Sequence, residues 1–251
     1  MYSIFTKGVL IMKISKSKKL EIRRKIIKAA VDIMTKKSFE SASMREIAQS
    51  AGIGEATIYN YFSTKEQLLY GFIEQTHMDV TSEVLAINGF ESFSLKEKLQ
   101  MWFESLFIAY LPNREFVQIV FDHTYRHPMT SLKALKTTRE AFNDLILSWV
   151  DDAIQRGEIN DQPMLRWISE HVWALGSGFC CYWLKDDSSQ FNQTTQLIDM
   201  SLDIIVKLLE SNVLGRVSDM MSFLIKSHIF KYFDSKPTHD LLKKVASYVK
   251  I

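Results

Sequence analysis

One stretch, from Ser43 to Lys65, limits what this chain can fold into more than any other: it reads SMREIAQSAGIGEATIYNYFSTK. Ser43 and Glu46 have the spacing of a capping box, in which two side chains satisfy backbone N–H groups at the start of a helix. Apolar residues follow at helical spacing until Gly52. Gly52 is expected to break this helix, and Ile53 and Gly54 to carry the chain round a tight turn, because glycine accepts the positive φ that other residues resist. The pattern predicts a helix that starts after Ser43 and ends in a glycine turn.

A second short helix is expected directly after the turn, from Glu55 to about Phe62. The spacing of Ser63 and Glu66 is that of another capping box and predicts the start of the next helix. Two helices joined by a glycine-containing turn of three or four residues form the helix-turn-helix plan. The second helix is short and carries polar side chains, so it fits the major groove of DNA.

Composition and charge agree with a helical protein that meets a polyanion at one end. Of 251 residues, 47% are apolar, and the four prolines and nine glycines favour an all-α chain with short connections. Residues 13–65 carry twelve Lys and Arg against five Asp and Glu, a net charge of +7. The whole chain carries only +2, so the remainder carries −5. This asymmetry indicates a nucleic acid partner near the N-terminus.

The first residues and the cysteines bear on where the protein works. We interpret residues 1–17 as a disordered leader, or as an upstream extension with Met12 as the start; a signal peptide is the less favoured interpretation. No segment approaches 18 unbroken apolar residues, so we expect no membrane span. Cys180 and Cys181 are adjacent in a helix, where neighbouring side chains diverge, and no other cysteine is available for a bridge. These features suggest the reducing cytoplasm, with the cysteines as small core residues rather than a redox switch.

A family resemblance enters with the stretch from Ile26 to Leu69, IIKAAVDIMTKKSFESASMREIAQSAGIGEATIYNYFSTKEQLL. Its order and spacing resemble the DNA-binding domain of TetR-type one-component transcriptional regulators. The resemblance rests on Ala29, Ala30, Phe39, Ile47, Ala48, Ala51, Gly52, Ile53, Thr57, Ile58, Tyr59, Tyr61, Phe62, Lys65 and Glu66. Ser38 stands where glycine is common in the family, and Tyr61 where histidine is frequent. A helix over residues 18–37, basic in its N-terminal half, would open this domain, and Phe39 would plug the small three-helix core.

The resemblance assigns roles to nine residues of the helix-turn-helix. Residues that open the second helix would face base edges, Tyr59 and Tyr61 would reach phosphates, and Asn60 could do either. Ser43 at a helix N-terminus would also approach phosphate, Arg45 could reach a phosphate or a guanine edge, and Lys65 resembles the family's phosphate-contacting lysine. The candidate DNA-binding residues are Ser43, Arg45, Glu55, Ala56, Thr57, Tyr59, Asn60, Tyr61 and Lys65.

The rest of the chain reads as a helical bundle, which gives the expected domain organisation: 1–17 leader, 18–64 DNA-binding domain and 65–251 ligand-binding and dimerisation domain. A helix from Lys65 to about Leu85 would link the two domains and could transmit a ligand-driven tilt to the DNA-binding head. Further helices are expected over about 95–110, 114–125, 131–156, 163–185, 194–211, 217–233 and 238–248.

Aromatic residues crowd this bundle, and the resemblance implies an inducer held between its helices. A single aromatic residue at helical spacing is more often part of the core than of a pocket. A pocket with these walls would suit an apolar or aromatic small molecule. The candidate ligand-binding residues are Trp102, Phe107, Tyr110, Phe121, Tyr125, Trp149 and His171.

Small residues at 174–178 lie inside an expected helix, at a cost in helix propensity, and favour a close approach of another helix. Such an approach could belong to a homodimer seam or to packing within one subunit, and both interpretations stay open. The apolar residues expected to complete a four-helix seam are Leu197, Ile198, Leu202, Ile205 and Leu209.

Catalysis and metal binding are less favoured. His123 and His127 have the i, i+4 spacing of helical metal ligands, but Pro128 disfavours a helical conformation at His127. We therefore expect that the protein binds no metal or other cofactor and is not an enzyme. The sequence predicts a cytoplasmic, homodimeric, ligand-responsive transcriptional regulator, a repressor released from a pseudo-palindromic double-stranded DNA operator. The alternative is an all-helical enzyme, acting on an apolar small molecule, with an appended DNA-binding head.

Overall fold

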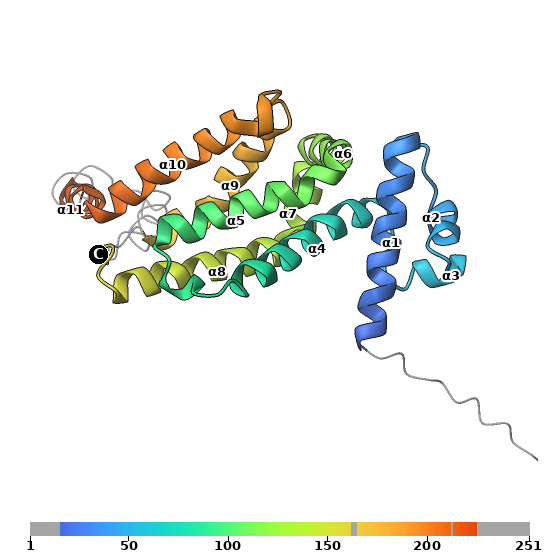
Figure 1. Cartoon of the computed structure of the whole chain (residues 1–251), viewed down its shortest axis with the longest axis horizontal. Helices are drawn as coiled ribbons and strands as arrows, with labels where there is room; N and C mark the ends of the chain where they lie inside the picture. The colour runs from blue at the N-terminus through green and yellow to red at the C-terminus, as the bar shows by residue number, and fades with distance from the viewer. Residues whose placement is uncertain (1–15, 162–164, 212, 225–251) are drawn as a thin grey trace, which may run out of the picture. The chain divides into compact units, whose positions relative to one another are not determined.

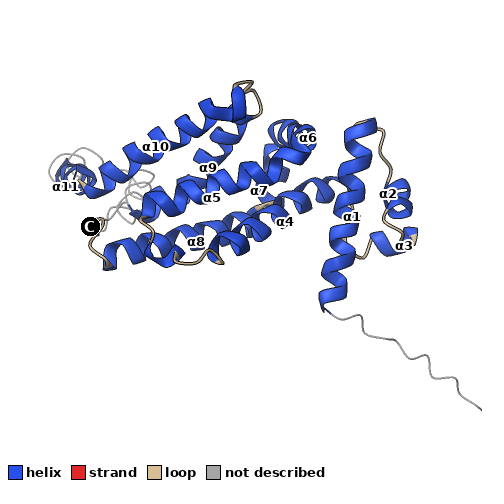
Figure 2. Cartoon of the chain, viewed as in Figure 1, coloured by secondary structure: helices blue, strands red, loops and turns tan. Residues whose placement is uncertain are grey.

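The structure, a computed structural model, describes residues 16–161, 165–211 and 213–224, which form helices and loops without a strand (Figure 2). The predicted all-α fold class, with an N-terminal helix-turn-helix and a C-terminal helical bundle, is therefore confirmed. The chain separates into two compact units between Phe72 and Ile73, a boundary that falls inside one helix.

The N-terminal unit is built on three helices and the beginning of a fourth. These are α1 (Lys16–Lys37), α2 (Met44–Ser50), α3 (Glu55–Ile58) and α4 (Lys65–Leu85), labelled in Figure 1. Ile26, Ala30 and Met34 line one face of α1 at intervals of four residues and are fully buried. Ile47 of α2 and Ile58 of α3 are equally buried. Their burial removes apolar surface from water, which is the main favourable term in folding.

Helix α1 ends at a backbone conformation that is unusual for its residue type. Ser38 has φ of 82°, in the left-handed region that favours glycine. Its N–H donates to the carbonyl of Met34 at 3.0 Å, and its Oγ accepts from the N–H of Ser41 at 3.5 Å. Phe39, expected as a plug of the small core, is only half-buried.

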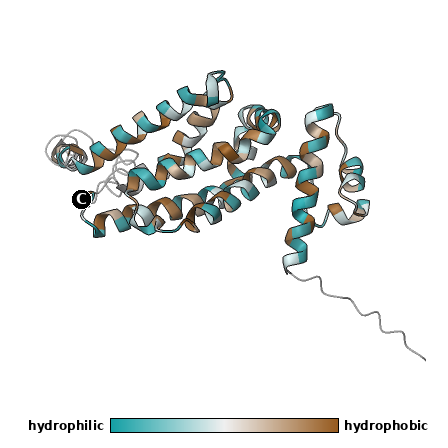
Figure 3. Cartoon of the chain, viewed as in Figure 1, coloured by the Kyte–Doolittle hydropathy of each residue, from teal (hydrophilic) through white to brown (hydrophobic). Residues whose placement is uncertain are grey.

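The C-terminal unit is a bundle in which α5 contacts α8, α9 and α10 (Figure 1). Hydrophobic residues run along α4, α5 and α8, which supply much of its core (Figure 3). Aromatic rings fill the interior: Trp102 lies 5.4 Å from Phe103 and 4.5 Å from Phe142, measured between ring centroids. The helices after α4 are α5 (Leu95–Tyr110), α6 (Arg114–Arg126), α7 (Pro128–Ala134), α8 (Lys136–Gln155), α9 (Leu165–Trp183), α10 (Asn192–Glu210) and α11 (Val213–Leu224).

The single helix expected over 131–156 is wrong, because the structure has two helices there. Pro128 starts α7 in the first helical turn, where its missing N–H costs no hydrogen bond. Leu135 then has φ of −90° and ψ of 7° and separates α7 from α8. His127 is non-helical, with φ of −128° and ψ of 59°, as expected for the residue before a proline.

Other expectations concern the ends of helices. Helix α9 ends at Trp183, two residues before the expected end. The leader before residue 16, the expected helix start at Pro163 and the expected helix at 238–248 lie outside the described residues. The helix expected at 217–233 is described only as far as Leu224, within α11.

Candidate nucleic-acid interface and ligand cavity

The N-terminus of α2 carries the predicted capping box, and it is confirmed. The N–H of Glu46 donates to Ser43 Oγ at 3.2 Å, while the N–H and hydroxyl of Ser43 donate to Glu46 Oε2 at 3.2 and 3.0 Å. Lys37 Nζ lies 2.6 Å from Glu46 Oε1. The hydrogen bond from Lys37 and those from Ser43 lower the pKa of Glu46. The polar atoms of Ser43 are thus engaged within the unit.

The candidate recognition segment begins at α3, which ends at Ile58, so the helix expected to reach about Phe62 is shorter than predicted. Hydrogen-bonded turns continue the segment to Phe62. Gly52 has φ of 69°, whereas Gly54, which precedes the first residue of α3, has φ of −67°. The expectation that Gly54 supplies the positive φ of the turn is therefore wrong, because Gly52 supplies it. The N–H groups of Tyr61 and Phe62 both donate to the carbonyl of Ile58 at 2.9 Å. Ile58 and Phe62 are buried and anchor the segment. Its exposed residues are Glu55, Ala56, Tyr59 and Asn60, and Thr57 and Tyr61 are half-buried.

Two of the candidate DNA-binding residues face each other across the turn. Arg45 Nε on α2 lies 3.8 Å from Glu55 Oε2 at the start of α3, and both side chains are well exposed. An exposed pair at this distance contributes little to stability. Both groups therefore stay accessible to a partner.

Lys65 makes contacts that the sequence did not indicate. Its ammonium group donates to the carbonyls of Phe39 at 2.8 Å and Glu40 at 3.0 Å, and it lies 4.8 Å from the centroid of the Phe39 ring. An ammonium group has three donors. Two of them hold the loop between α1 and α2 to the start of α4.

The capping box expected at Ser63 and Glu66 is wrong. The carboxamide oxygen of Gln67 accepts from the N–H and the hydroxyl of Ser63 at 2.7 and 3.1 Å. The N–H of Gln67 donates to Thr64 Oγ1 at 3.4 Å. Helix α4 is thus capped one residue later than expected, because Thr64 stands three residues before Gln67 in the S/T-x-x-E/Q pattern.

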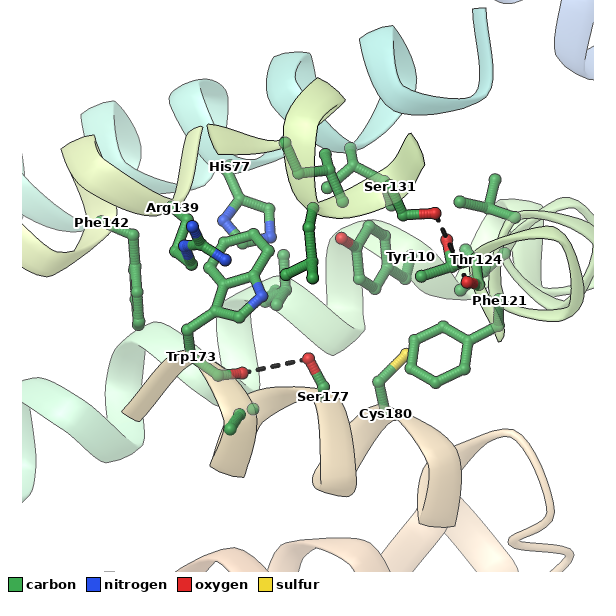
Figure 4. A pocket seen from close by; sticks show the side chains of 18 of the residues that line it. His77, Tyr110, Phe121, Thr124, Ser131, Arg139, Phe142, Trp173, Ser177 and Cys180 are labelled. Carbon is green, nitrogen blue, oxygen red and sulfur yellow. Dashed lines mark hydrogen bonds between the residues drawn. The ribbon is translucent and has the colours of Figure 1, made fainter. Parts of the chain in front are cut away.

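A cavity of about 460 Å³ lies within the C-terminal unit, lined by residues of α4 to α9 (Figure 4). This volume falls among those of small-molecule sites. Of the seven candidate ligand-binding residues, Trp102, Tyr110, Phe121 and Tyr125 line it.

The other three candidates do not line this cavity. Phe107 stacks on Trp183, with ring centroids 5.4 Å apart, and Trp149 packs edge-on against Phe90 at 5.6 Å. His171 is exposed. Helical spacing could not separate these residues from the lining ones, because both sets are aromatic residues of the same bundle.

Sequence reasoning missed two polar residues that line the cavity, His77 on α4 and Arg139 on α8. A signal existed for Arg139: it stands four residues after Leu135 and three before Phe142, so a charge interrupts an apolar helical face. For His77 the sequence offers no comparable signal.

Aromatic rings surround the His77 imidazole. The ring centroids of Trp102 and Trp173 lie 5.1 Å away, and that of Phe142 lies 6.1 Å away. Burial lowers the pKa of His77 to about 3, so the imidazole is neutral at physiological pH. Its Nδ1 is buried without a hydrogen-bond partner within the described part of the chain. Leaving a buried polar atom unpaired costs about 1–3 kcal/mol.

A second apolar feature runs along the outside of the bundle. Met200, Ile204 and Leu208 recur every four residues on α10 and are exposed. The opposite face of the helix, with Ile198, Leu202 and Leu209 from the expected dimer seam, is buried within the subunit. The expectation that these three residues form a seam is therefore wrong, and the exposed stripe consists of their neighbours.

The small residues of α9 were expected to serve either a homodimer seam or packing within one subunit, and its two glycines differ in this respect. A Cβ on Gly176 would lie 2.8 Å from Phe103 Cε1, so Gly176 serves close packing within the subunit. A Cβ on Gly178 would meet nothing within 4 Å. Gly178 is exposed together with Ala174 and Tyr182, at intervals of four residues on the same helix.

Residues 16–161, 165–211 and 213–224 contain neither a metal-binding cluster nor a membrane-spanning helix. No three His, Cys, Asp or Glu side chains gather there in a way that could hold a metal ion, although the rings of His123 and His127 lie 4.7 Å apart. Among the same residues, we find no helix with the length and hydropathy that a bilayer crossing requires.

Comparison with protein families matches both units. A family model described as "Bacterial regulatory proteins, tetR family" matches residues 26–70. A second, described as "Tetracyclin repressor-like, C-terminal domain", matches residues 98–224.

Similar proteins include several named regulators. The fatty acid metabolism regulator protein of Bacillus subtilis is 23% identical over 206 residues, 75% of this chain and 93% of that protein. The transcriptional activator FasR of Mycolicibacterium smegmatis is 23% identical over 167 residues, 66% of this chain and 74% of that protein. YdgC, an HTH-type transcriptional regulator of B. subtilis, is 28% identical over 109 residues, but the match spans only 56% of its length.

Solved structures share the fold at low sequence identity. A TetR-family transcriptional regulator from Syntrophomonas wolfei superposes with a TM-score of 0.60 at 17% identity, over 76% of this chain and 97% of that one. The fatty acid degradation regulator FadR of Bacillus halodurans superposes with a TM-score of 0.54 at 18% identity, over 72% and 93%.

Proposed function

Because this chain belongs to the TetR family of DNA-binding transcriptional regulators, we propose that it is a repressor controlled by a small ligand. The observation that carries the proposal is the cavity of about 460 Å³ with aromatic walls, in a unit other than the one that holds the helix-turn-helix. Binding of a ligand there would favour one conformation of the bundle and so change the affinity for DNA.

An apolar or aromatic small molecule suits this cavity. Trp102, Phe121, Phe142 and Trp173 offer ring surfaces to it, and burial of apolar ligand surface against them is favourable. Two similar proteins are named as regulators of fatty acid metabolism and fatty acid degradation, which supports a ligand of apolar character.

DNA recognition would use the exposed side of the α3 segment. Tyr59 and Asn60 present hydroxyl and amide groups there, and no contact within the described part of the chain engages either side chain. Glu55, Ala56 and Thr57 open the helix and would lie closest to base edges. Ser43, Arg45 and Tyr61 would help to dock the unit on the phosphate backbone, and Lys65 would support docking by holding the loop between α1 and α2 in place.

A homodimer would bring two such units to one operator. The exposed stripe of Met200, Ile204 and Leu208 on α10, beside Ala174 and Gly178 on α9, is the surface we assign to the seam. A two-fold dimer would read half-sites about 34–36 Å apart or a multiple of that spacing. Such a regulator would act in the cytoplasm, where the chromosome lies.

Repression is the sign of regulation that we propose, supported by the repressor-like description of the C-terminal family model. Helix α4 contributes to both units: Leu68 and Leu69 belong to the N-terminal core, and Ile73 and His77 line the cavity. A ligand that shifts α4 at the cavity would alter the separation of two recognition segments and release DNA.

The test starts from selection of binding sites out of a random DNA pool by the purified full-length chain. We expect a pseudo-palindromic site, a dimer by light scattering, and loss of DNA binding when an apolar ligand occupies the cavity. Asn60→Ala should abolish selection, while Lys133→Gln, at an exposed position of α7, should leave it unchanged. Selection of no site, or a monomer at micromolar concentration, would contradict the proposal. In a reporter strain, transcription that falls when the chain is deleted would identify an activator instead.

A further inference from the structure

The polar groups on the cavity wall differ in what they already bind. Ser131 Oγ donates to the carbonyl of His127 at 2.9 Å, and Ser177 Oγ donates to the carbonyl of Trp173 at 3.0 Å. Both hydroxyl protons are therefore used within the bundle. Cys180 is buried, and burial raises the pKa of its thiol to about 12, so it carries no charge. These three groups offer little to a charged ligand.

Arg139 is different, because its guanidinium group has no hydrogen bond or ion pair with any described residue. Other arginines of the same unit are engaged: Arg114 donates to the carbonyls of Trp183 at 2.8 Å and Asp186 at 2.9 Å. Arg156 pairs with Asp152 at 3.1 Å. A guanidinium group without a partner inside an apolar wall is a place where an anion can bind.

The charge that the described residues contribute to the cavity wall is positive. Of the described residues that line the cavity, none is Asp or Glu. The guanidinium group of Arg139 is positively charged, whereas burial lowers the pKa of His77 and keeps it neutral. A cationic ligand would meet repulsion from Arg139 and no countercharge among the described lining residues, while an anion would find a counter-ion.

We propose that the cavity takes an amphiphile with a single carboxylate, which pairs with Arg139 while its apolar body lies against Trp102, Phe142 and Trp173. The inference rests on the proposed function, since it names the chemical class of the regulatory ligand. The planar guanidinium group can hold both oxygens of a carboxylate at once, and this favours a carboxylate over a neutral amide or alcohol.

His77 supplies a second polar contact for the same ligand. Figure 4 shows the side chains of His77 and Arg139 reaching into the space between the helices that line the cavity. A neutral imidazole has one donor and one acceptor, and neither ring nitrogen is hydrogen-bonded to a described residue. A carboxylate oxygen or a polar group on the ligand body can therefore be bound beside the aromatic rings.

The experiment compares ligands that differ only in charge. Decanoate and decanamide form one matched pair, and 1-naphthylacetate and 1-naphthylacetamide form another. Binding to the full-length protein is measured by calorimetry and by tryptophan fluorescence, because Trp102 and Trp173 line the cavity. We expect at least one carboxylate to bind about 10- to 100-fold more tightly than its amide, which is the range for hydrogen bonds to a charged group.

Substitutions assign the preference to Arg139. In Arg139→Gln, the carboxylate should bind as weakly as the amide, while the affinity for the amide stays unchanged. Arg139→Lys should keep part of the preference, because it keeps the charge and loses the planar fork. Lys133→Gln removes one positive charge from an exposed position outside the cavity and should change neither affinity.

Three results would overturn the inference: equal affinity for carboxylate and amide, a preference that survives in Arg139→Gln, or no binding of either carboxylate. A separate measurement of DNA binding by the same preparations distinguishes this failure from failure of the proposed function. If the chain binds a selected operator and releases it with a neutral ligand, the regulator stands and only the carboxylate is wrong.

Discussion

The two units differ in whether their polar side chains have hydrogen-bond partners. In the N-terminal unit, Lys37, Ser43 and Glu46 bond to one another, and Lys65 holds two carbonyls of a neighbouring loop. In the C-terminal cavity, Arg139 and His77 have no hydrogen-bond partner among the described residues. Paired groups stabilise a rigid head whose exposed residues can dock as a preformed surface. Side chains without a partner stay available for a ligand, and the buried one, His77, also costs stability.

We expect the two units to differ in how well they accommodate an added methyl group, and a matched pair of glycine substitutions tests this with the largest expected effect. A Cβ on Gly71 would lie 2.6 Å from the buried ring of Phe62, and a Cβ on Gly176 would lie 2.8 Å from the ring of Phe103. Phe103 borders the cavity and can move into it. We expect Gly71→Ala to destabilise its unit by about 2–3 kcal/mol and Gly176→Ala by less than about 1 kcal/mol.

Hydrogen exchange measured separately over the two units checks this pair. Equal losses for the two variants would show that the cavity wall is as rigid as the N-terminal core. In that case the contrast in packing would not hold.

Removal of a hydrogen-bonded cationic side chain should destabilise its unit more than removal of one that has no partner. Lys65→Ala leaves two carbonyls without their donor, so we expect the N-terminal unit to lose about 1–3 kcal/mol. Arg139→Gln breaks no bond to a described residue and should leave the stability of the C-terminal unit within about 0.5 kcal/mol. Urea denaturation gives both numbers.

The salt dependence of DNA binding shows what Lys65 does. Loss of a phosphate contact should reduce the slope of log affinity against log salt by about one. Since two donors of Lys65 are used internally, we expect the affinity to fall for all sequences alike with the slope unchanged. A shallower slope would identify Lys65 as a phosphate anchor.

Tyr59→Phe, at an exposed position, should weaken binding to all sequences without changing stability.

His77 makes the C-terminal unit sensitive to acid. Its pKa is about 3 in the folded chain against 6.5 unperturbed, so the unfolded state takes up a proton first as the pH falls. The stability from this residue is fully present above pH 6.5 and declines between pH 6.5 and 3, by up to about 1.4 kcal/mol per pH unit. Denaturation midpoints at pH 7.0 and 5.5 measure it. His77→Phe should lack this decline and be the more stable protein at both values; the same decline in both proteins would refute the assignment.

The smallest expected effect concerns the end of α1. Ser38 adopts φ of 82°, which glycine accepts without steric cost. Ser38→Gly should therefore stabilise the N-terminal unit by about 0.5–1 kcal/mol, less the weak contact from Ser38 Oγ to Ser41. A thermal melt measures the change. Lower stability would mean that the contact with Ser41 outweighs the strained backbone.

The sequence predicted the N-terminal unit well because its signals are local. The capping box at Ser43, the glycine turn and the bounds of α4 each depend on residues within a few positions of one another. The misplaced cap at Ser63 came from two overlapping S/T-x-x-E/Q patterns, which differ by one residue. Only the hydrogen bonds of Gln67 distinguish them.

The cavity was less predictable because six helices contribute to it. Aromatic residues of lining and of core have the same spacing, so Trp102 and Trp149 could not be separated without their neighbours. The sequence pattern does indicate Arg139, because its charge interrupts an apolar helical face. Its missing partner became visible only once the surrounding helices were in place.

The break at Leu135 between α7 and α8 has a consequence for how such proteins diversify. Helices α6 and α7 present part of the cavity wall, yet Tyr125 and Leu132 on them are exposed and add little to the core. Substitutions there can change the shape of the wall without disturbing the packing of α5 against α8, α9 and α10. The cavity can thereby change its shape through substitutions in one short segment of the chain.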